Sequence, residues 1–228
     1  MTGRRLTKFL QWLPLFALVF TWGCTHDNYE SGDGDYSYLT SAFSMLRINS
    51  AGSAVSFVTD DNTEYTLEQS QKITGARADT TYRVLAYYNE TSTRRTVLRG
   101  IKTVYVIRPE VEDALYGAEY DPVVLNSVWT SANGAYLNLG LSLMEGVADN
   151  NDDTSQKLGM TLSEDSQASS AKYKSYTLTL LHDQNGVPEY YKSAAYVSVP
   201  LDNFSQNDTL NVVVNTYDGV SRKTVVVP

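Results

Sequence analysis

The stretch AYLNLGLSL, residues 135–143, decides the fold class of this chain. Leucine stands at every second position from Leu137 to Leu143, and aromatic, small or polar residues stand beside it. Because successive side chains of a β-strand point to opposite faces, this spacing predicts a strand with one apolar face. Beyond Tyr36, no window of 12 or more residues has the 3.6-residue apolar spacing of a helix. We therefore expect an all-β protein.

Strands of this kind fill the C-terminal half of the chain. Residues 123–228 contain seven apolar or alternating segments separated by turn residues. They are Val123–Thr130, Ala135–Met144, Lys157–Ser163, Ser175–His182, Tyr190–Val199, Thr209–Thr216 and Arg222–Val227. Seven alternating strands predict an antiparallel β-sandwich. Trp129 is the sole tryptophan after Cys24, and we expect it to pack in the sandwich core.

Residues 38–108 contain five further strand candidates, and the last of them is unusually long. They are Leu39–Ile48, Ala54–Thr59, Glu64–Leu67, Thr81–Tyr88 and Arg94–Ile107. Gly100 inside the last strand predicts a bend or a bulge. Five strands in a segment of this size predict a small closed Greek-key barrel of the OB type, with half of a sandwich as the alternative. Barrels of this shape bind oligosaccharides or peptides on a strand face, which is an analogy of fold and not evidence for a site.

Pro109 ends the long strand because proline cannot donate a hydrogen bond to the strand ladder. Residues 109–122 then carry four acidic residues and Gly117, so we place the connector between the two domains there. One short helix is expected in this connector, at Glu110–Leu115.

The first 23 residues have the layout of an export signal peptide. The cations Arg4, Arg5 and Lys8 precede an apolar run from Phe9 to Phe20, which is too short to span a bilayer. A buried core helix is the alternative interpretation of this run.

A small residue, Gly23, stands directly before Cys24, as in the lipobox of bacterial lipoproteins, although Thr21 occupies the position where these usually carry leucine. This resemblance predicts cleavage before Cys24 and lipidation of its sulfur, whereas an ordinary signal peptide would leave Cys24 unmodified. More than one acyl chain on Cys24 would anchor the protein stably in a membrane. We expect the bacterial outer membrane, with the choice between its outer and periplasmic faces open.

Residues 24–37 form an acidic segment without aliphatic residues. Such a segment cannot bury enough apolar area to fold, which predicts a flexible tether.

Removing residues 1–23 takes away three cations and no acid, so the net charge falls from −8 to −11. This charge excludes a basic nucleic-acid-binding protein. A single cysteine excludes a disulfide scaffold and a zinc site built on several thiolates.

The sequence offers no pattern for catalysis. His182 is the one histidine beyond the tether, and its HDQNG context indicates a hairpin turn and not a catalytic base. The acidic runs Asp149–Asp153 and Asp60–Asn62 lack the ligand spacing of a calcium loop and read as solvated loops. We therefore expect no catalytic residue, no metal and no cofactor.

Tyrosine is the most suggestive bias in the composition, with 17 tyrosines against 6 phenylalanines. A tyrosine ring suits stacking on sugars or contact with peptides, and its hydroxyl adds a hydrogen bond. The pairs Tyr87–Tyr88 and Tyr190–Tyr191 are candidate exposed ligand-binding clusters. Ordinary sheet composition is the alternative, because tyrosine favours half-buried strand positions.

Three segments resemble the NigD-like family of bacterial lipoproteins. They are YRVLAYYNE at residues 82–90, VLRGIKTVYVIRP at residues 97–109, and Trp129 followed by AYLNLGLSL at residues 135–143. The sequence departs from the family at the tether, where NYESGDGDYS stands in place of a DDGYSLG-like run. The resemblance implies an OB-like N-terminal domain and a C-terminal β-sandwich, with no catalytic residues to carry over.

Three functions are open at this point. The first is a non-enzymatic envelope lipoprotein that binds a protein, peptide or glycan partner. The second is an immunity lipoprotein against a secreted toxin, which rests on the origin of the family's name in a bacteriocin gene cluster. The third is a carboxylate-dependent hydrolase, which would need two acids facing each other across a cleft.

Overall fold

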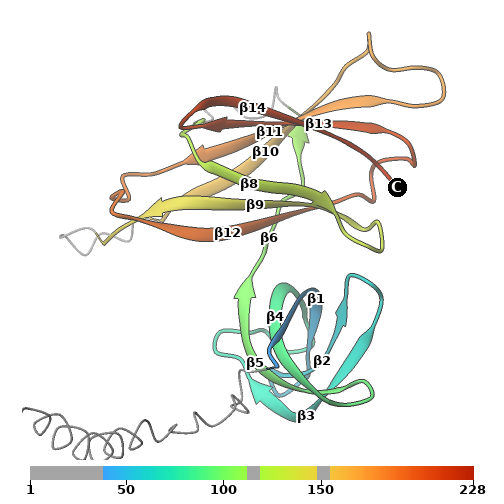
Figure 1. The fold of residues 1–228 in the computed structure, drawn as a ribbon, viewed down its shortest axis with the longest axis vertical. Helices are drawn as coiled ribbons and strands as arrows, with labels where there is room; N and C mark the ends of the chain where they lie inside the picture. Colours follow the sequence, from blue (N-terminus) through green and yellow to red (C-terminus); the bar gives the residue numbers. More distant parts are fainter. Residues whose placement is uncertain (1–37, 112–118, 148–154) are drawn as a thin grey trace, which may run out of the picture. The chain divides into compact units, whose positions relative to one another are not determined.

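The computed structural model describes residues 38–111, 119–147 and 155–228, and these residues form strands and no helix (Figure 1). Residues 39–228 group into one compact unit. The predictions for the export signal, for Cys24, for the tether and for Asp149–Asp153 fall outside the described residues. In the described ranges no helix is long and apolar enough to cross a membrane.

The N-terminal half of this unit is a closed five-stranded barrel. Its strands are β1 (Thr40–Ile48), β2 (Ser53–Thr59), β3 (Glu64–Lys72), β4 (Thr81–Ser92) and β5 (Arg95–Thr103). They are hydrogen-bonded in the order β1-β2-β3-β5-β4, with β4 paired to β1 and with β3 parallel to β5. The expected closed Greek-key barrel is therefore confirmed, and half of a sandwich is excluded. The bulge expected near Gly100 is present, because Tyr87 pairs with Gly100 and Tyr88 with Leu98.

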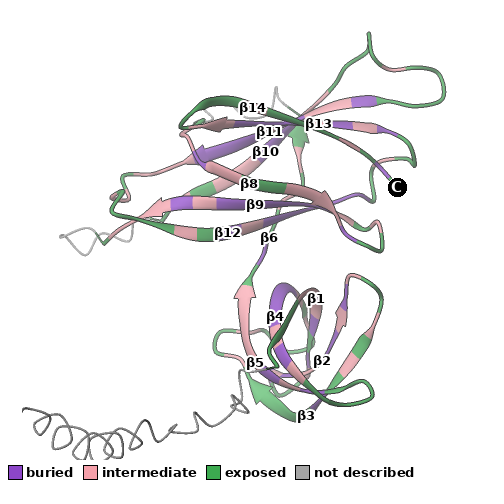
Figure 2. Cartoon of the chain, viewed as in Figure 1, coloured by how far each residue is buried: buried purple, intermediate pink, exposed green. Residues whose placement is uncertain are grey.

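Alternating side chains fill the barrel. Leu46, Phe57 and Leu98 are among the buried residues that form its core. The rings of Phe57, Tyr65 and Tyr88 pack together inside it, with ring centres 4.9 to 5.3 Å apart. Figure 2 shows that buried residues concentrate on β4, whereas the end of β3 is exposed.

The C-terminal half is a sandwich of two sheets. The five-stranded sheet has the order β14-β13-β11-β10-β7, and the four-stranded sheet has the order β6-β12-β9-β8. Their strands are β6 (Tyr105–Val106), β7 (Glu110–Val111), β8 (Val124–Thr130), β9 (Tyr136–Glu145), β10 (Lys157–Glu164), β11 (Ser175–Asp183), β12 (Tyr191–Pro200), β13 (Thr209–Thr216) and β14 (Gly219–Val226). All seven strands predicted for this half are present, within a few residues at each end. The strand β14 forms an exposed edge, with Arg222 and Lys223 in its middle.

The transition between the two halves lies earlier in the chain than expected. The segment predicted as one barrel strand, Arg94–Ile107, is divided, because β5 ends at Thr103 and β6 pairs with β12 of the sandwich. Residues Glu110 and Val111, where a helix was expected, instead form β7 and pair with β10. The remainder of that expected helix, residues 112–115, lies outside the described residues. Strands of two residues are too short to produce a periodic pattern, so the sequence gives no signal for them.

The leucines of β9 lie in the core of the sandwich, as their spacing predicts. Leu137, Leu139 and Leu141 have no exposed surface. They pack with the inward residues of β11, β12 and β13, such as Leu178, Val197 and Val212. The two sheets therefore enclose one continuous apolar layer.

Trp129 does not pack in this core, and the expectation that it does is wrong. Its neighbour Val128 packs against the core, so the pleat of β8 turns Trp129 to the outer face of the four-stranded sheet. There the Trp129 ring meets Phe43 of the barrel strand β1 at 5.4 Å, edge to face. Phe43 also contacts Tyr196 of β12, at 5.3 Å. Trp129 is therefore part of the contact between barrel and sandwich.

A buried arginine reinforces this contact. The Arg83 guanidinium on β4 forms an ion pair with Asp60 in the turn between β2 and β3. Arg83 also donates to the Ser198 hydroxyl of β12 at 3.2 Å, and its carbon Cζ lies 4.2 Å from the centre of the Tyr136 ring. The expectation that Asp60 belongs to a solvated loop is wrong, since its side chain is only 16% exposed.

Candidate binding site

A pocket of about 290 Å³ opens at one end of the sandwich, where β9 ends and β12 begins. Its lining combines two tyrosine rings, an apolar floor and a few polar groups. The lining residues are Tyr105, Leu143, Glu145, Gly146, Ser155, Gln156, Leu158, Val187 and Tyr191. They come from β6, β9, β10, β12 and the turns beside them, so both sheets contribute. We call this site the tyrosine pocket.

The strand register explains why Glu145 and Tyr191 both face the pocket. The two residues are direct cross-strand partners of β9 and β12, and such partners project from the same face of a sheet. Glu145 lies two residues beyond Leu143, so it continues the inward row of leucines at the open end of the core. The Tyr190 N–H donates to the Glu145 carbonyl at 2.9 Å and extends the pairing to the rim.

The strand register also places Tyr105 on the inward face of the four-stranded sheet. It is the register partner of Val197, a core residue with no exposed surface, in the parallel pair of β6 and β12. Tyr105 is nevertheless 50% exposed, because β6 is the edge of its sheet. The pocket thus has tyrosines of strands β6 and β12 on its lining.

A network of amide hydrogen bonds holds the polar wall of the pocket. The carbonyl of Met144 accepts from Gln156 Nε2 at 2.7 Å and from Gln184 Nε2 at 2.9 Å. The Gln156 oxygen lies 2.8 Å from His182 Nε2, and His182 Nδ1 lies 3.2 Å from the Asp121 carbonyl. Both ends of the Gln156 amide are therefore engaged in hydrogen bonds within the protein.

Gly146 allows the rim to close tightly over the end of β9. A Cβ atom at this position would lie 2.7 Å from the Pro188 carbonyl oxygen and 2.8 Å from Tyr190 Cδ2. Any larger residue would push away the turn that carries Pro188 and Tyr190. The glycine is thus required for the close approach of backbone and ring.

The four predicted tyrosines have different environments. Tyr190 and Tyr191 are 71% and 54% exposed, Tyr191 lines the pocket and Tyr190 stands at its rim. Tyr88 is 4% exposed in the barrel core, so the expectation that it is exposed is wrong. Burial raises the pKa of the Tyr88 hydroxyl well above its ordinary value. Tyr87 lies half-buried on the opposite face of β4, so the two do not form a pair.

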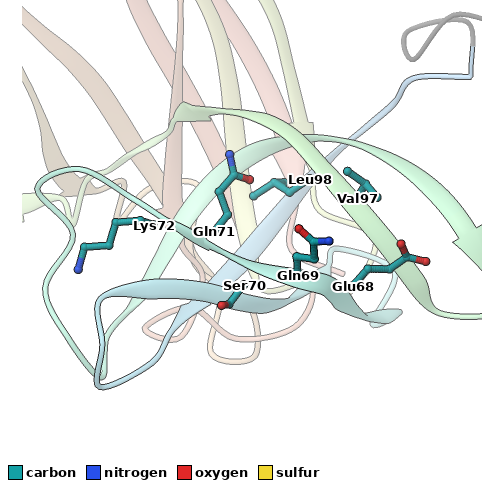
Figure 3. A pocket seen from close by; sticks show the side chains of 7 residues that line it. All are labelled: Glu68, Gln69, Ser70, Gln71, Lys72, Val97 and Leu98. Atoms are coloured by element: carbon teal, nitrogen blue, oxygen red, sulfur yellow. The ribbon is translucent and has the colours of Figure 1, made fainter.

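The barrel contains a second and larger hollow, of about 440 Å³, at the seam between β3 and β5. Figure 3 shows its lining, with Val97 and Leu98 of β5 across from the polar side chains of β3. The β3 side chains are Glu68, Gln69, Ser70, Gln71 and Lys72. This lining has no aromatic ring on which a sugar or base could stack. The tyrosine pocket is therefore the better candidate for a binding site.

Two kinds of feature would support catalysis within the described residues: a group of metal ligands and an accessible histidine. Within residues 38–111, 119–147 and 155–228, no group of three or more histidine, cysteine, aspartate or glutamate side chains is placed to hold a metal ion. His182 is 2% exposed, and the partners of both its ring nitrogens are an amide oxygen and a backbone carbonyl. The buried imidazole therefore belongs to the hydrogen-bonded wall behind the tyrosine pocket.

Tyr105 and Glu145 are among the pocket residues that sequence reasoning missed. Tyr105 was assigned to a barrel strand, because VLRGIKTVYVIRP contains no asparagine, aspartate or proline that would mark a turn before Pro109. Glu145 stands two residues past Leu143, at the next inward position of the leucine row. A carboxylate at an inward position is the signal that could have identified it.

The barrel, the sandwich and their shared face define a two-domain β-protein, and comparison with known proteins identifies its family. Residues 103–227 match the C-terminal β-sandwich domain of the NigD-like family. That match covers more than half of the chain, so the protein belongs to the NigD-like family. Among curated proteins, none matches the sequence.

Solved structures share the fold. A NigD-like immunity protein from Bacteroides caccae superposes with a TM-score of 0.61 and 23% identity, over 82% of this chain and 91% of its own. A protein of unknown function from Bacteroides vulgatus gives a TM-score of 0.59 and 17% identity, over 83% and 91%. A candidate lipoprotein from Bacteroides fragilis gives 0.55 and 10%, over 82% and 96%. At these identities the likeness establishes the fold alone.

Proposed function

We propose that the protein is a non-enzymatic, lipid-anchored binding protein of the bacterial envelope, and that the tyrosine pocket receives part of a partner polypeptide. The observation that carries this proposal is the pocket itself, in which two tyrosines, a carboxylate and an apolar floor come together at one end of the sandwich. Tyrosine is enriched in protein-binding surfaces because it offers large contact area at low entropic cost. The candidate lipoprotein of the same fold from Bacteroides fragilis supports the lipid anchor.

The environment of His182 supports a non-enzymatic role. A general base must reach the proton that it removes, and both nitrogens of this buried imidazole already contact oxygen atoms of the protein. The Gln156 amide beside it is engaged in the same way. We therefore assign these two residues to the support of the pocket wall.

Site-specific photo-crosslinking in the bacterial envelope tests the proposal. A photoreactive amino acid replaces Tyr190 at the rim, and a matched variant carries it at Tyr173, which is exposed in the turn before β11. We expect a discrete polypeptide adduct from position 190 and none from position 173. Equal adducts from both positions, or a position-190 variant that captures no polypeptide, would contradict the proposal.

An immunity role is the second candidate. It is favoured by family membership and by the fold shared with the NigD-like immunity protein from Bacteroides caccae. The adduct from position 190 would then contain a secreted toxin and not a resident envelope protein. Expression of the protein in a toxin-sensitive strain would also raise survival, and unchanged survival would exclude this role.

A further inference from the structure

We infer that the tyrosine pocket binds a cationic side chain, a lysine or an arginine of the partner polypeptide. This inference rests on the proposed function and names the chemistry of the partner at that site. Four features of the described residues carry it: the position of Glu145, the two tyrosines, the apolar floor and the engaged Gln156 amide.

Glu145 places a negative charge at the mouth of the sandwich core, and no cation within the described residues forms an ion pair with it. No ion pair or side-chain hydrogen bond links its carboxylate to another residue of the described ranges. Removing a carboxylate from water costs free energy unless a partner compensates it. A cation that entered the pocket would supply that partner.

The nearest lysines in the strand register do not fill this role. Lys192 follows Tyr191 on β12, so the pleat turns it to the opposite face of the sheet. Lys157 precedes the pocket residue Leu158 on β10, and its ammonium forms an ion pair with Asp183 at 3.2 Å. Neither of these two lysines is therefore placed to balance the charge of Glu145.

The rest of the lining suits the remaining parts of a lysine or arginine side chain. Tyrosine rings attract a cation placed over their faces, and Tyr105 and Tyr191 both line the pocket. The apolar surface of Leu143, Leu158 and Val187 suits the methylene stem, which long cationic side chains bury readily. A pocket of about 290 Å³ lies just below the usual range for sites that hold drug-sized ligands, which suits a smaller group such as one side chain.

Other ligands fit this lining less well. An anion would meet the Glu145 carboxylate, and the described residues that line the pocket include no cationic side chain. A neutral sugar would leave the charge of the Glu145 carboxylate unbalanced, and both ends of the Gln156 amide are already engaged. The net charge of −8 for the whole chain favours encounter with a cationic partner.

A titration with defined peptides tests this inference on the detergent-solubilised full chain. The probes are three blocked pentapeptides that differ only in a central lysine, norleucine or glutamate between glycines. We expect the lysine peptide to bind at least ten-fold more tightly than the norleucine peptide, and the glutamate peptide most weakly. Binding of lysine and norleucine peptides with equal affinity would overturn the inference.

Variants locate the effect in the pocket. Glu145→Gln should weaken binding of the lysine peptide about ten-fold, which corresponds to about 1.4 kcal/mol. The control Glu189→Gln removes the same charge from the same end of the sandwich, at a residue that does not line the pocket, and should leave affinity unchanged. Tyr191→Phe keeps the ring and should retain binding, whereas Tyr191→Leu should lose it. Equal urea midpoints verify that each variant is folded.

The two proposals fail in different ways. If crosslinking at position 190 captures a polypeptide and Glu145→Gln does not reduce that capture, the cationic inference is wrong and the binding function stands. If no polypeptide is captured, the binding function is wrong, whatever the peptides show.

Discussion

The guanidinium of Arg83 on β4 is paired with the carboxylate of Asp60, which lies in the turn after β2. The two side chains are 1% and 16% exposed, and Arg83 Nη2 lies 2.8 Å from Asp60 Oδ2. Arg83 reaches Ser198 of the sandwich from the same position, so one cation contacts both domains. Burying a guanidinium this completely costs free energy, and the anionic partner offsets that cost.

Replacing Asp60 should therefore destabilise the whole unit. We expect Asp60→Asn to lower the free energy of unfolding by about 3 to 5 kcal/mol, because a buried guanidinium would lose its counter-charge. Urea denaturation followed by tryptophan fluorescence measures the change, since Trp129 lies beside the contact. The control Asp218→Asn, at an exposed turn, should have almost no effect. Equal unfolding energies for the two variants would show that the ion pair is unimportant.

A Cβ at position 146 should disturb the rim of the tyrosine pocket. We expect Gly146→Ala to cost about 1 to 3 kcal/mol, because the added methyl would overlap the Pro188 carbonyl and the Tyr190 ring. Thermal denaturation and peptide titration together measure the two consequences, lower stability and weaker binding. Gly159→Ala is the matched control, because its Cβ would meet Leu181 at an ordinary 3.4 Å. A Gly146→Ala variant as stable as this control would refute the steric account.

Asp61 should contribute to acid sensitivity. Hydrogen bonds to its carboxylate, first from the Thr59 hydroxyl and then from the Thr63 N–H, hold the pKa of Asp61 below its ordinary value of 3.8. A carboxylate with a lowered folded pKa stabilises the fold above pH 3.8, and this contribution is lost as the pH falls through the folded pKa. Urea midpoints measured from pH 6 down to roughly pH 2 should fall less steeply for Asp61→Asn than for the wild type. Parallel curves would contradict this assignment.

The lipid anchor can be tested independently of the fold. We expect Cys24→Ala to release the protein from the membrane fraction, because the variant has no sulfur to carry acyl chains. Fractionation and immunoblotting measure the distribution, with Thr25→Ala as the neighbouring control that should stay membrane-bound. A Cys24→Ala protein that remains in the membrane fraction at the wild-type level would exclude the anchor.

Most of the fold could be predicted from the sequence, because long strands have a strong period. The four alternating leucines of β9 and the segments like them gave the twelve longer strands and the order of barrel and sandwich. The short strands β6 and β7 could not be predicted, since two residues contain no period. They are defined by pairing with β12 and β10, which lie far along the chain.

The binding site was predictable only in part. The abundance of tyrosine suggested Tyr190 and Tyr191 as site residues. Composition does not show which tyrosines face inward, so Tyr88 was wrongly predicted to be exposed. The direction of Trp129 depended on the register of β8, and the burial of Asp60 depended on a distant arginine. Tyr105 and Glu145 join Tyr191 only because three strands lie side by side. Such relationships arise from the pairing of strands that are distant in the chain, and the neighbouring residues in the sequence do not indicate them.

The exposed edge of the larger sheet has a consequence for how copies of this protein meet. If two β14 strands approached each other antiparallel about their midpoints, Arg222 of one copy would lie opposite Lys223 of the other. Like charges directly opposite each other disfavour strand pairing, and a charged edge is a common safeguard against aggregation. We therefore expect copies at high density not to polymerise through paired β14 strands.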